Sequence, residues 1–167
     1  MTTICKLCGK VAAQAGLADE NAITYGICKS CSVHSLTTNM NRLLENIEAP
    51  ILLMQGNPRQ VVSANRHALH VFGKTLPQVE NMRGGQVFDC EHSFSEAGCG
   101  KDENCEHCTI RNAIVDTFNT GTPHSGISTP LPVRKAGRAE TRMLQVSTEK
   151  VGELALVRIE RYEHSAK

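Results

Sequence analysis

The 167-residue chain carries 18 Lys and Arg against 17 Asp and Glu, and 40% of its residues are hydrophobic, a composition typical of a globular protein rather than a disordered tail. Its formal net charge of +1 provides no overall attraction to nucleic acid or an anionic membrane, so we expect neither partner. No apolar run reaches the ~20 residues of a membrane span, and the N-terminus lacks a signal-peptide pattern. We therefore expect a cytoplasmic protein, in which eight cysteines indicate metal or redox chemistry rather than disulfides.

The first four cysteines follow the pattern C-x2-C-x19-C-x2-C and are Cys5, Cys8, Cys28 and Cys31. Two residues between paired cysteines allow a tight turn to direct both sulfurs at one ion, and Gly9 and Gly26 supply the backbone freedom that such turns need. This spacing predicts a zinc site, with Zn as the cofactor. The plain alternative is a set of reduced, metal-free thiols.

An amphipathic helix over about 31–48 follows the second cysteine pair. Apolar residues recur there at three- and four-residue steps, namely Val33, Leu36, Met40, Leu43, Leu44 and Ile47. A cysteine turn, a short hairpin and a second cysteine pair that opens a helix resemble a treble-clef zinc finger over residues 4–35. The apolar stripe can support a homodimer through helix 31–48, or it can pack on the sheet of its own chain.

Two short strands and a short helix are predicted next. Residues 51–55 and 60–64 are apolar runs on either side of a turn at 56–58, which indicates a β-hairpin. Asn65 is the expected N-cap of a short helix that Gly73 ends.

The second cysteine quartet follows the pattern C-x8-C-x5-C-x2-C and consists of Cys90, Cys99, Cys105 and Cys108. Gly98 and Gly100 allow the loop to fold back on itself, and Asn104 is the expected N-cap of a helix that starts at the last cysteine pair and ends before Gly121. Four thiolates suit either Zn or an iron-sulfur cluster, so both metals stay open at this site.

The residues around the second quartet leave two further alternatives. His92 and His107 can replace a thiol or serve as surface histidines, and a nearby carboxylate could support an open catalytic zinc, although no hydrolase motif is present. Acidic residues outnumber Lys101 in this segment and should make a cluster a poor electron acceptor. They are Asp89, Glu91, Glu96, Asp102, Glu103 and Glu106.

Three strands are predicted at the end of the chain, over 125–133, 140–148 and 153–160, with turns between them. The basic residues around the first of these turns indicate a solvated hairpin, with a nucleic-acid contact as the alternative. They are Arg134, Lys135, Arg138 and Arg142. His67 and His70 lie one helical turn apart and indicate a solvated helix face, with a ligand or haem contact as the alternative.

The order of these elements, with the residues Ile51–Asn65 and the Phe72-Gly73 helix end, resembles a PAS domain from about Ala49 to Tyr162. That resemblance implies an α+β fold with a five-stranded antiparallel sheet and helices on one face. The segment from Gly84 to Gly121 resembles bacterial PAS domains that carry a four-cysteine insertion. We therefore expect a zinc-finger-like module at 1–34, a connecting helix at 35–48, a PAS-like domain at 49–162 with its insertion at 89–108, and a tail at 163–167.

The PAS resemblance implies a non-enzymatic sensor or adaptor in bacterial signal transduction. It would act by regulated binding to a protein partner and would respond to redox or metal. Two alternatives stay open: a transcriptional regulator that binds nucleic acid through the zinc finger, and a metal-dependent hydrolase.

Overall fold

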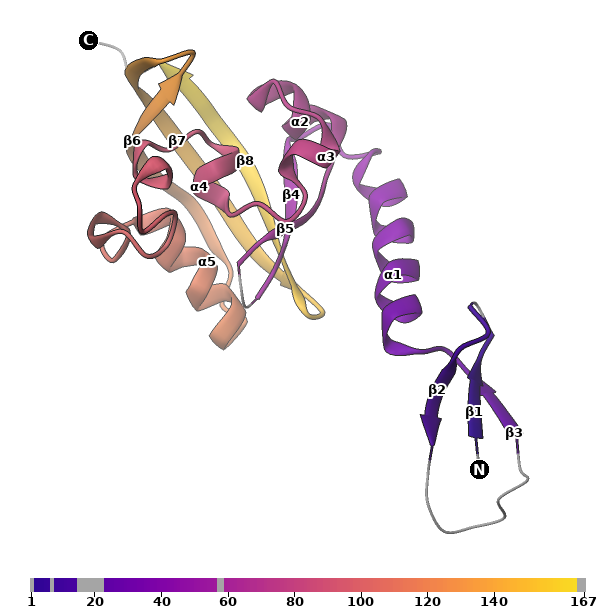
Figure 1. Cartoon of the computed structure of the whole chain (residues 1–167). Helices are drawn as coiled ribbons and strands as arrows, with labels where there is room; N and C mark the ends of the chain where they lie inside the picture. Colours follow the sequence, from indigo (N-terminus) through magenta and orange to yellow (C-terminus); the bar gives the residue numbers. More distant parts are fainter. Residues whose placement is uncertain (1, 7, 15–22, 57–58, 165–167) are drawn as a thin grey trace. The chain divides into compact units, whose positions relative to one another are not determined.

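The computed structural model describes residues 2–6, 8–14, 23–56 and 59–164, and the chain divides into two compact units, Met1–Leu43 and Leu44–Lys167 (Figure 1). Part of the predicted turn, 57–58, and the last tail residues, 165–167, lie outside the described residues. So do the side chains of Val33, Leu36 and Met40 in the predicted apolar stripe. No helix among the described residues is long and apolar enough to cross a membrane.

The smaller unit contains a three-stranded sheet and one long helix. Its strands are β1 (Thr2–Cys5), β2 (Val11–Gln14) and β3 (Ile23–Gly26), and its helix is α1 (Lys29–Leu44). The central strand β1 pairs antiparallel with β2 and parallel with β3. This arrangement brings the end of β1 next to the segment between β3 and α1, so the two cysteine pairs meet.

Helix α1 ends at Leu44, earlier than the predicted end at Glu48. The side-chain amide of Asn65 donates hydrogen bonds to the carbonyl oxygens of Leu44, Ile47 and Ala49, at 3.1, 3.1 and 2.8 Å. These carbonyls at and beyond the helix end are satisfied by a side chain rather than by a further helical turn. The apolar periodicity alone could not reveal this tertiary cap.

The larger unit is built on a five-stranded antiparallel sheet in the order β5-β4-β8-β7-β6. Its strands are β4 (Ile51–Gln55), β5 (Val61–Ala64), β6 (His124–Lys135), β7 (Arg138–Val151) and β8 (Leu154–His164). All five strands confirm the sequence prediction, and the last three are longer than predicted. The fold is the predicted PAS-like α+β fold.

Four helices lie over one face of this sheet (Figure 1). They are α2 (Arg66–Phe72), α3 (Leu76–Val79), α4 (Gly84–Val87) and α5 (Thr109–Thr120). Two short 3-10 turns, η1 (Glu91–Phe94) and η2 (Glu103–Cys105), lie in the cysteine segment. The aliphatic core between the layers includes Val87, Ile114, Leu144 and Val157.

The start of α5 differs from the prediction. Asn104 is not the N-cap of this helix, because it lies in the separate turn η2, whose own N-cap is Asp102. Helix α5 begins at Thr109, and its N-cap is Cys108, whose sulfur accepts a hydrogen bond from the backbone N–H of Arg111. Asn65 and Gly73 are the N-cap and C-cap of α2, as predicted, and Gly121 ends α5.

Candidate metal centres

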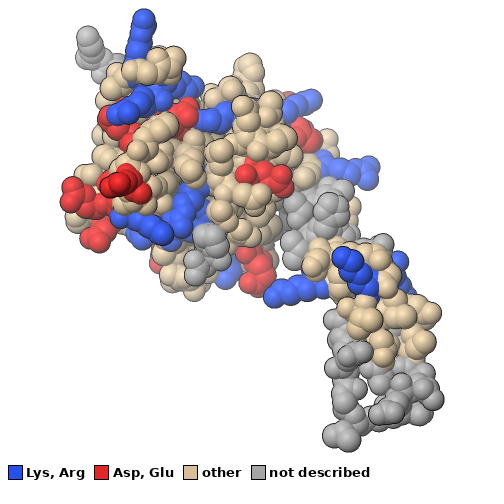
Figure 2. All heavy atoms as spheres, in the orientation of Figure 1, with Lys and Arg blue, Asp and Glu red and all other residues tan. Residues whose placement is uncertain are grey.

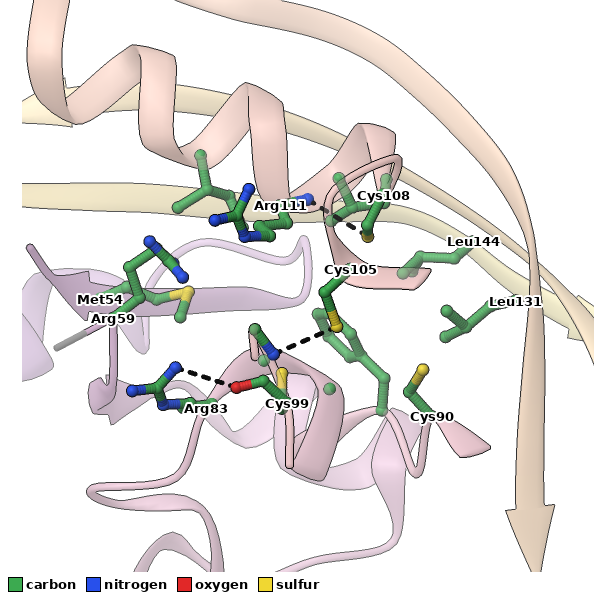
Figure 3. Close-up of a pocket in the computed structure, with 16 residues that line it drawn as sticks. Met54, Arg59, Arg83, Cys90, Cys99, Cys105, Cys108, Arg111, Leu131 and Leu144 are labelled. Carbon is green, nitrogen blue, oxygen red and sulfur yellow. Dashed lines mark hydrogen bonds between the residues drawn. The ribbon is translucent and has the colours of Figure 1, made fainter. Parts of the chain in front are cut away.

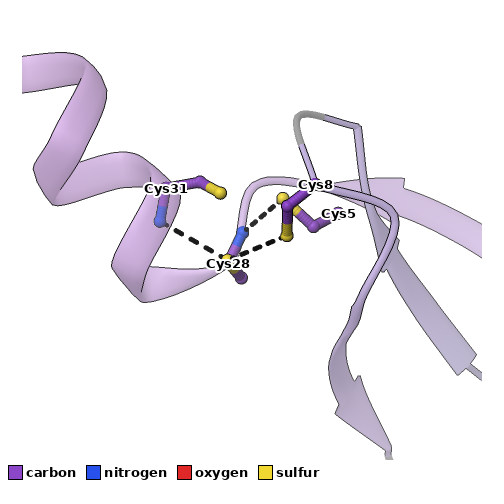
Figure 4. A group of neighbouring side chains, drawn as sticks. All are labelled: Cys5, Cys8, Cys28 and Cys31. Atoms are coloured by element: carbon purple, nitrogen blue, oxygen red, sulfur yellow. Dashed lines mark hydrogen bonds between the residues drawn. The ribbon is translucent and has the colours of Figure 1, made fainter.

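The sulfur atoms of Cys5, Cys8, Cys28 and Cys31 all lie within 4.8 Å of one another (Figure 4). The Sγ atoms of Cys8 and Cys28 are 3.8 Å apart. Four thiolates at about 2.3 Å from one zinc ion in a tetrahedron are about 3.8 Å from each other. The first quartet therefore has the spacing that a single tetrahedral ion requires.

Local backbone structure brings these four thiols together. Cys5 is the buried last residue of β1, and Gly9, at φ 72°, closes the turn after it by donating its N–H to the Cys5 carbonyl oxygen at 2.9 Å. Cys28 precedes α1 and Cys31 lies in its first turn. The N–H of Cys28 donates to Cys5 Sγ at 3.3 Å, and such N–H groups stabilise thiolate.

The thiols of the first quartet interact with one another. Hydrogen bonds with Cys28 and Cys8 raise the pKa of the Cys31 thiol to about 12. The Cys31 thiol therefore retains its proton at neutral pH, and a bound metal ion would have to displace that proton.

The second quartet lines a cavity of about 70 Å³ between the helices and the sheet (Figure 3). Cys90, Cys99, Cys105 and Cys108 all contribute to its wall, and the close-up places their side chains around the same space. The rest of the wall is mainly apolar. It includes Met54, Phe88, Ile110, Ile114, Leu131 and Leu144.

Backbone N–H groups approach the thiols at the α5 end of this cavity. The N–H of Gly100 donates to Cys105 Sγ at 3.2 Å, and the N–H of Arg111 donates to Cys108 Sγ at 3.5 Å. Hydrogen bonds of this kind stabilise sulfur that carries negative charge.

The other two thiols of the second quartet have the same kind of donor. Burial raises the pKa of the Cys90 thiol to about 11, and a backbone hydrogen bond from His92 acts in the opposite direction. Burial also raises the pKa of the Cys99 thiol, opposed by a backbone hydrogen bond from Gly85. Backbone N–H groups therefore act on all four thiols of the second quartet, most directly on Cys105 and Cys108.

The two quartets differ in how closely their sulfurs approach. Among the described residues, the first quartet is the one group of three or more His, Cys, Asp or Glu side chains whose ligand atoms lie within 4.8 Å of one another. The second quartet shares a cavity at wider spacing. The ring of His92 lies 3.8 Å from a carboxylate oxygen of Asp102, beside the cysteine segment.

The charged residues in the cavity wall are arginines, which the sequence did not predict, and the acidic residues predicted around the thiols lie outside this wall. Arg59, Arg83 and Arg111 line the cavity, and none of the acidic residues that the structure describes does. Two of the six acidic residues pair with basic residues outside the wall: Asp89 binds Lys74 at 2.5 Å, and Glu91 binds Arg134 at 2.9 Å. The charged side chains that line the cavity with the thiols are therefore positive.

The sequence contains no local signal for these three arginines. Arg59 lies between β4 and β5, Arg83 is the N-cap of α4, and Arg111 lies in the first turn of α5. Each is a single basic residue in a different segment, and only the fold brings them together.

The basic residues around the β6–β7 turn do not form a surface of one sign. Arg134 pairs with Glu91, and Arg142 pairs with Glu140 at 2.6 Å. On the face of the larger unit that Figure 2 shows, acidic and basic side chains lie next to each other.

No family model and no curated protein matches the chain. Among solved structures, the Rhodobacter sphaeroides LOV protein is similar with a TM-score of 0.52 and 15% identity, over 77% of this chain and 67% of that one. The PAS domain of Bordetella pertussis BvgS matches with a TM-score of 0.46 and 13% identity, over 80% of this chain and 88% of that one. At these identities the similarity to the LOV protein concerns the fold alone.

Proposed function

We propose that this protein is a cytoplasmic, metal-containing sensor or adaptor of bacterial signal transduction. In this proposal it acts by regulated protein binding rather than by catalysis, and the loss or oxidation of the centre at Cys90, Cys99, Cys105 and Cys108 is the signal. The observation that carries the proposal is that four thiols from one short segment line a single, mainly apolar cavity, in which backbone N–H groups donate to the sulfurs of Cys105 and Cys108. The PAS-like fold supports a sensory role by analogy.

We assign different metals to the two quartets. The 3.8 Å separation of Cys8 Sγ and Cys28 Sγ supports Zn at Cys5, Cys8, Cys28 and Cys31, in a treble-clef-like finger. The second quartet is more widely spaced, which supports an iron-sulfur cluster, because each thiolate then binds a different iron and the sulfurs stand farther apart than around one ion. The cluster would supply the redox chemistry, and the cysteines would hold it.

Helix α5 is the element that would transmit a change at the second quartet. Cys108 is its N-cap, so release of this thiol alters the first turn of the helix. Farther along α5, the Thr117 hydroxyl lies 2.7 Å from the Thr148 hydroxyl of β7, and both are buried. A shift of the start of α5 would therefore reach the sheet through this contact with β7.

The smaller unit would provide the docking surface for a protein partner. It exposes several apolar side chains, among them Val11, Ile23, Tyr25, Ile27 and Leu43. Exposed apolar surface of this kind is typical of protein contacts. Leu43 lies in α1, the helix through which we also propose that two copies pair.

Anaerobic purification followed by zinc, iron and sulfide analysis and a visible spectrum tests these assignments. Cys8→Ser and Cys99→Ser form a matched pair, because each removes one thiol from a different quartet. We expect Cys8→Ser to lose zinc and keep iron and the visible absorption, and Cys99→Ser to do the opposite. Full retention of metal by Cys99→Ser would refute the second centre, and two zincs without colour would refute the cluster.

The sensor role needs a separate measurement. We expect oxidation in air to change the self-association of the intact protein in analytical ultracentrifugation. Cys99→Ser should show the same self-association before and after oxidation. If the intact protein and Cys99→Ser associate identically before and after oxidation, the second quartet does not control binding through this surface.

A further inference from the structure

We propose that Arg59, Arg83 and Arg111 form a binding site for a small phosphate-type dianion at the mouth of the cysteine-lined cavity. This site is separate from the metal ligands and would give the protein a small-molecule signal. Figure 3 places the three arginine side chains on one side of the cavity and the sulfurs of Cys90 and Cys105 on the other.

The arginines approach one another closely for three like charges. At Gly100, Arg83 Nη1 and Arg59 Nη2 lie 2.9 and 3.0 Å from the position that a Cβ atom would occupy, so the two guanidinium groups meet over this residue. Burial lowers the pKa of Arg59, and the charges of Arg111 and Arg83 lower it further. Such an arrangement costs free energy unless an anion compensates it.

The compensation within the protein comes from the thiols: Cys99 and Cys105 raise the pKa of Arg59, against the larger effects of burial and the other two arginines. In the part of the chain that the structure describes, no carboxylate forms an ion pair with any of the three arginines. Arg83 Nη1 donates to the carbonyl oxygen of Cys99 at 2.9 Å, and Arg111 Nη1 donates to Asn112 Oδ1 at 2.9 Å. The Nε atom of Arg111 is buried without a hydrogen-bond partner among the described residues. A buried guanidinium nitrogen without an acceptor indicates a missing ligand atom.

The size and chemistry of the space favour an oxyanion. Planar guanidinium groups bind phosphate and carboxylate oxygens in pairs, and three of them match the charge of a dianion better than that of a halide. Arg59 also lines an adjoining groove of about 610 Å³, together with Phe118 and Lys150. The dianion can therefore be free phosphate or the phosphate group of a larger molecule that lies in the groove.

Phosphate binding by the metal-loaded protein tests the proposal. Isothermal titration with inorganic phosphate is compared with chloride at equal ionic strength, and ribose 5-phosphate is the second ligand. We expect phosphate to bind and chloride not to bind. Tighter binding of ribose 5-phosphate would identify a phosphate ester as the ligand, and equal binding would identify the free ion. If neither phosphate compound binds, the proposal is wrong.

The variants separate this site from the metal centre. Among the described residues, the Arg59 side chain forms no hydrogen bond with the cysteine segment. Arg59→Gln should therefore weaken phosphate binding at least about tenfold and leave the metal content unchanged. Arg111→Lys keeps the charge without the planar fork and should give an intermediate loss. Arg158→Gln is the control, because Arg158 is exposed and lines neither cavity.

Loss of metal from Arg59→Gln without any change in phosphate affinity would show that the arginines only balance the charge of the thiolates, and it would overturn the proposal. This outcome is distinct from failure of the proposed metal centre, because the phosphate measurement and the metal analysis are made on the same samples.

Discussion

The hydroxyl of Tyr162 in β8 donates a hydrogen bond to the carbonyl oxygen of Phe88, 2.8 Å away. The Tyr162 ring also packs against Phe72, with 5.2 Å between ring centroids, and the Arg142 guanidinium lies 4.9 Å from the ring centroid. Because Phe88 is two residues before Cys90, this bond connects the last strand of the sheet to the start of the cysteine segment.

Tyr162→Phe should give a pH-dependent difference in stability from the intact protein. Burial raises the pKa of Tyr162 from 10.0 to about 12, so the stabilisation from the neutral phenol is complete below pH 10 and is lost as the pH rises toward 12. We expect Tyr162→Phe to lower the free energy of unfolding by about 1 kcal/mol near neutral pH, through the lost hydrogen bond. Urea unfolding at several pH values should show this gap closing above pH 10. A gap that stays constant to pH 12 would contradict the pKa shift.

Asn65→Ala should be among the most destabilising single changes in the larger unit. Asn65 is 1% exposed, its amide nitrogen donates to three carbonyls, and its Oδ1 accepts from the N–H groups of Ile51 and Ala68, both at 3.0 Å. Removal of the side chain leaves these groups buried without partners, which should lower the free energy of unfolding by about 3 kcal/mol.

Thermal unfolding with two comparison variants tests the role of Asn65. Asn65→Asp keeps the acceptor and loses the donors, so it should also be strongly destabilising, because its charge faces the carbonyl oxygens. The control is Asn119→Ala, an exposed position in α5. If Asn65→Asp is as stable as the intact protein, the donated bonds contribute little.

The sequence predicted those features of the fold whose signals are local. The five strands follow from apolar runs between turn residues, and Gly73 and Gly121 end their helices at φ 63° and 78°, a backbone conformation that favours glycine. The first quartet was predicted from its spacing, because two residues between paired cysteines allow a tight turn to direct both sulfurs at one point, and the pairing of β1 with β3 then brings the two pairs together.

The remaining features depend on distant residues. The end of α1 is set by Asn65, which the local pattern of the helix does not contain. The positive side chains in the cavity wall are Arg59, Arg83 and Arg111, which come from three separate segments, whereas Asp89 and Glu91, adjacent to the thiols in sequence, pair with Lys74 and Arg134. Sequence proximity therefore did not predict the charged residues that line this cavity.

The buried hydroxyls of Thr117 and Thr148 should show unequal effects when they are replaced by Val. The Thr117 hydroxyl donates to the Thr122 carbonyl oxygen at 2.9 Å, so its one hydrogen is used, and the Thr148 hydroxyl must donate to Thr117. Thr117→Val leaves the buried Thr148 donor unpaired and should lower the free energy of unfolding by about 2 kcal/mol. Thr148→Val leaves Thr117 with its other bond and should cost about 1 kcal/mol.

The double variant Thr117→Val/Thr148→Val completes a thermodynamic cycle, measured by chemical unfolding. We expect it to be no less stable than Thr117→Val alone, because the unpaired donor is removed as well. Additive losses would mean that the two hydroxyls are not coupled, and α5 would then lack this polar connection to β7.

Gly85→Ala should disrupt the second quartet, whereas Gly84→Ala should not. A Cβ atom at Gly85 would lie 2.7 Å from Cys99 Sγ and 3.3 Å from Cys99 Cβ, so the cysteine must move. At Gly84 the nearest atom would be Cε2 of Phe88, at 3.4 Å, an ordinary contact. Both residues belong to the same helical turn, so the pair isolates the contact with Cys99 from any change in helix propensity.

We expect Gly85→Ala to lose most of the metal bound at the second quartet and to lower the free energy of unfolding by about 2 kcal/mol, since the added methyl group overpacks the wall of the cavity. Gly84→Ala should keep its metal. Metal analysis and thermal unfolding of both variants test this prediction. Equal metal content in Gly85→Ala and Gly84→Ala would mean that the second centre keeps its metal when Cys99 is displaced. Cys99 would then not be a ligand of this centre.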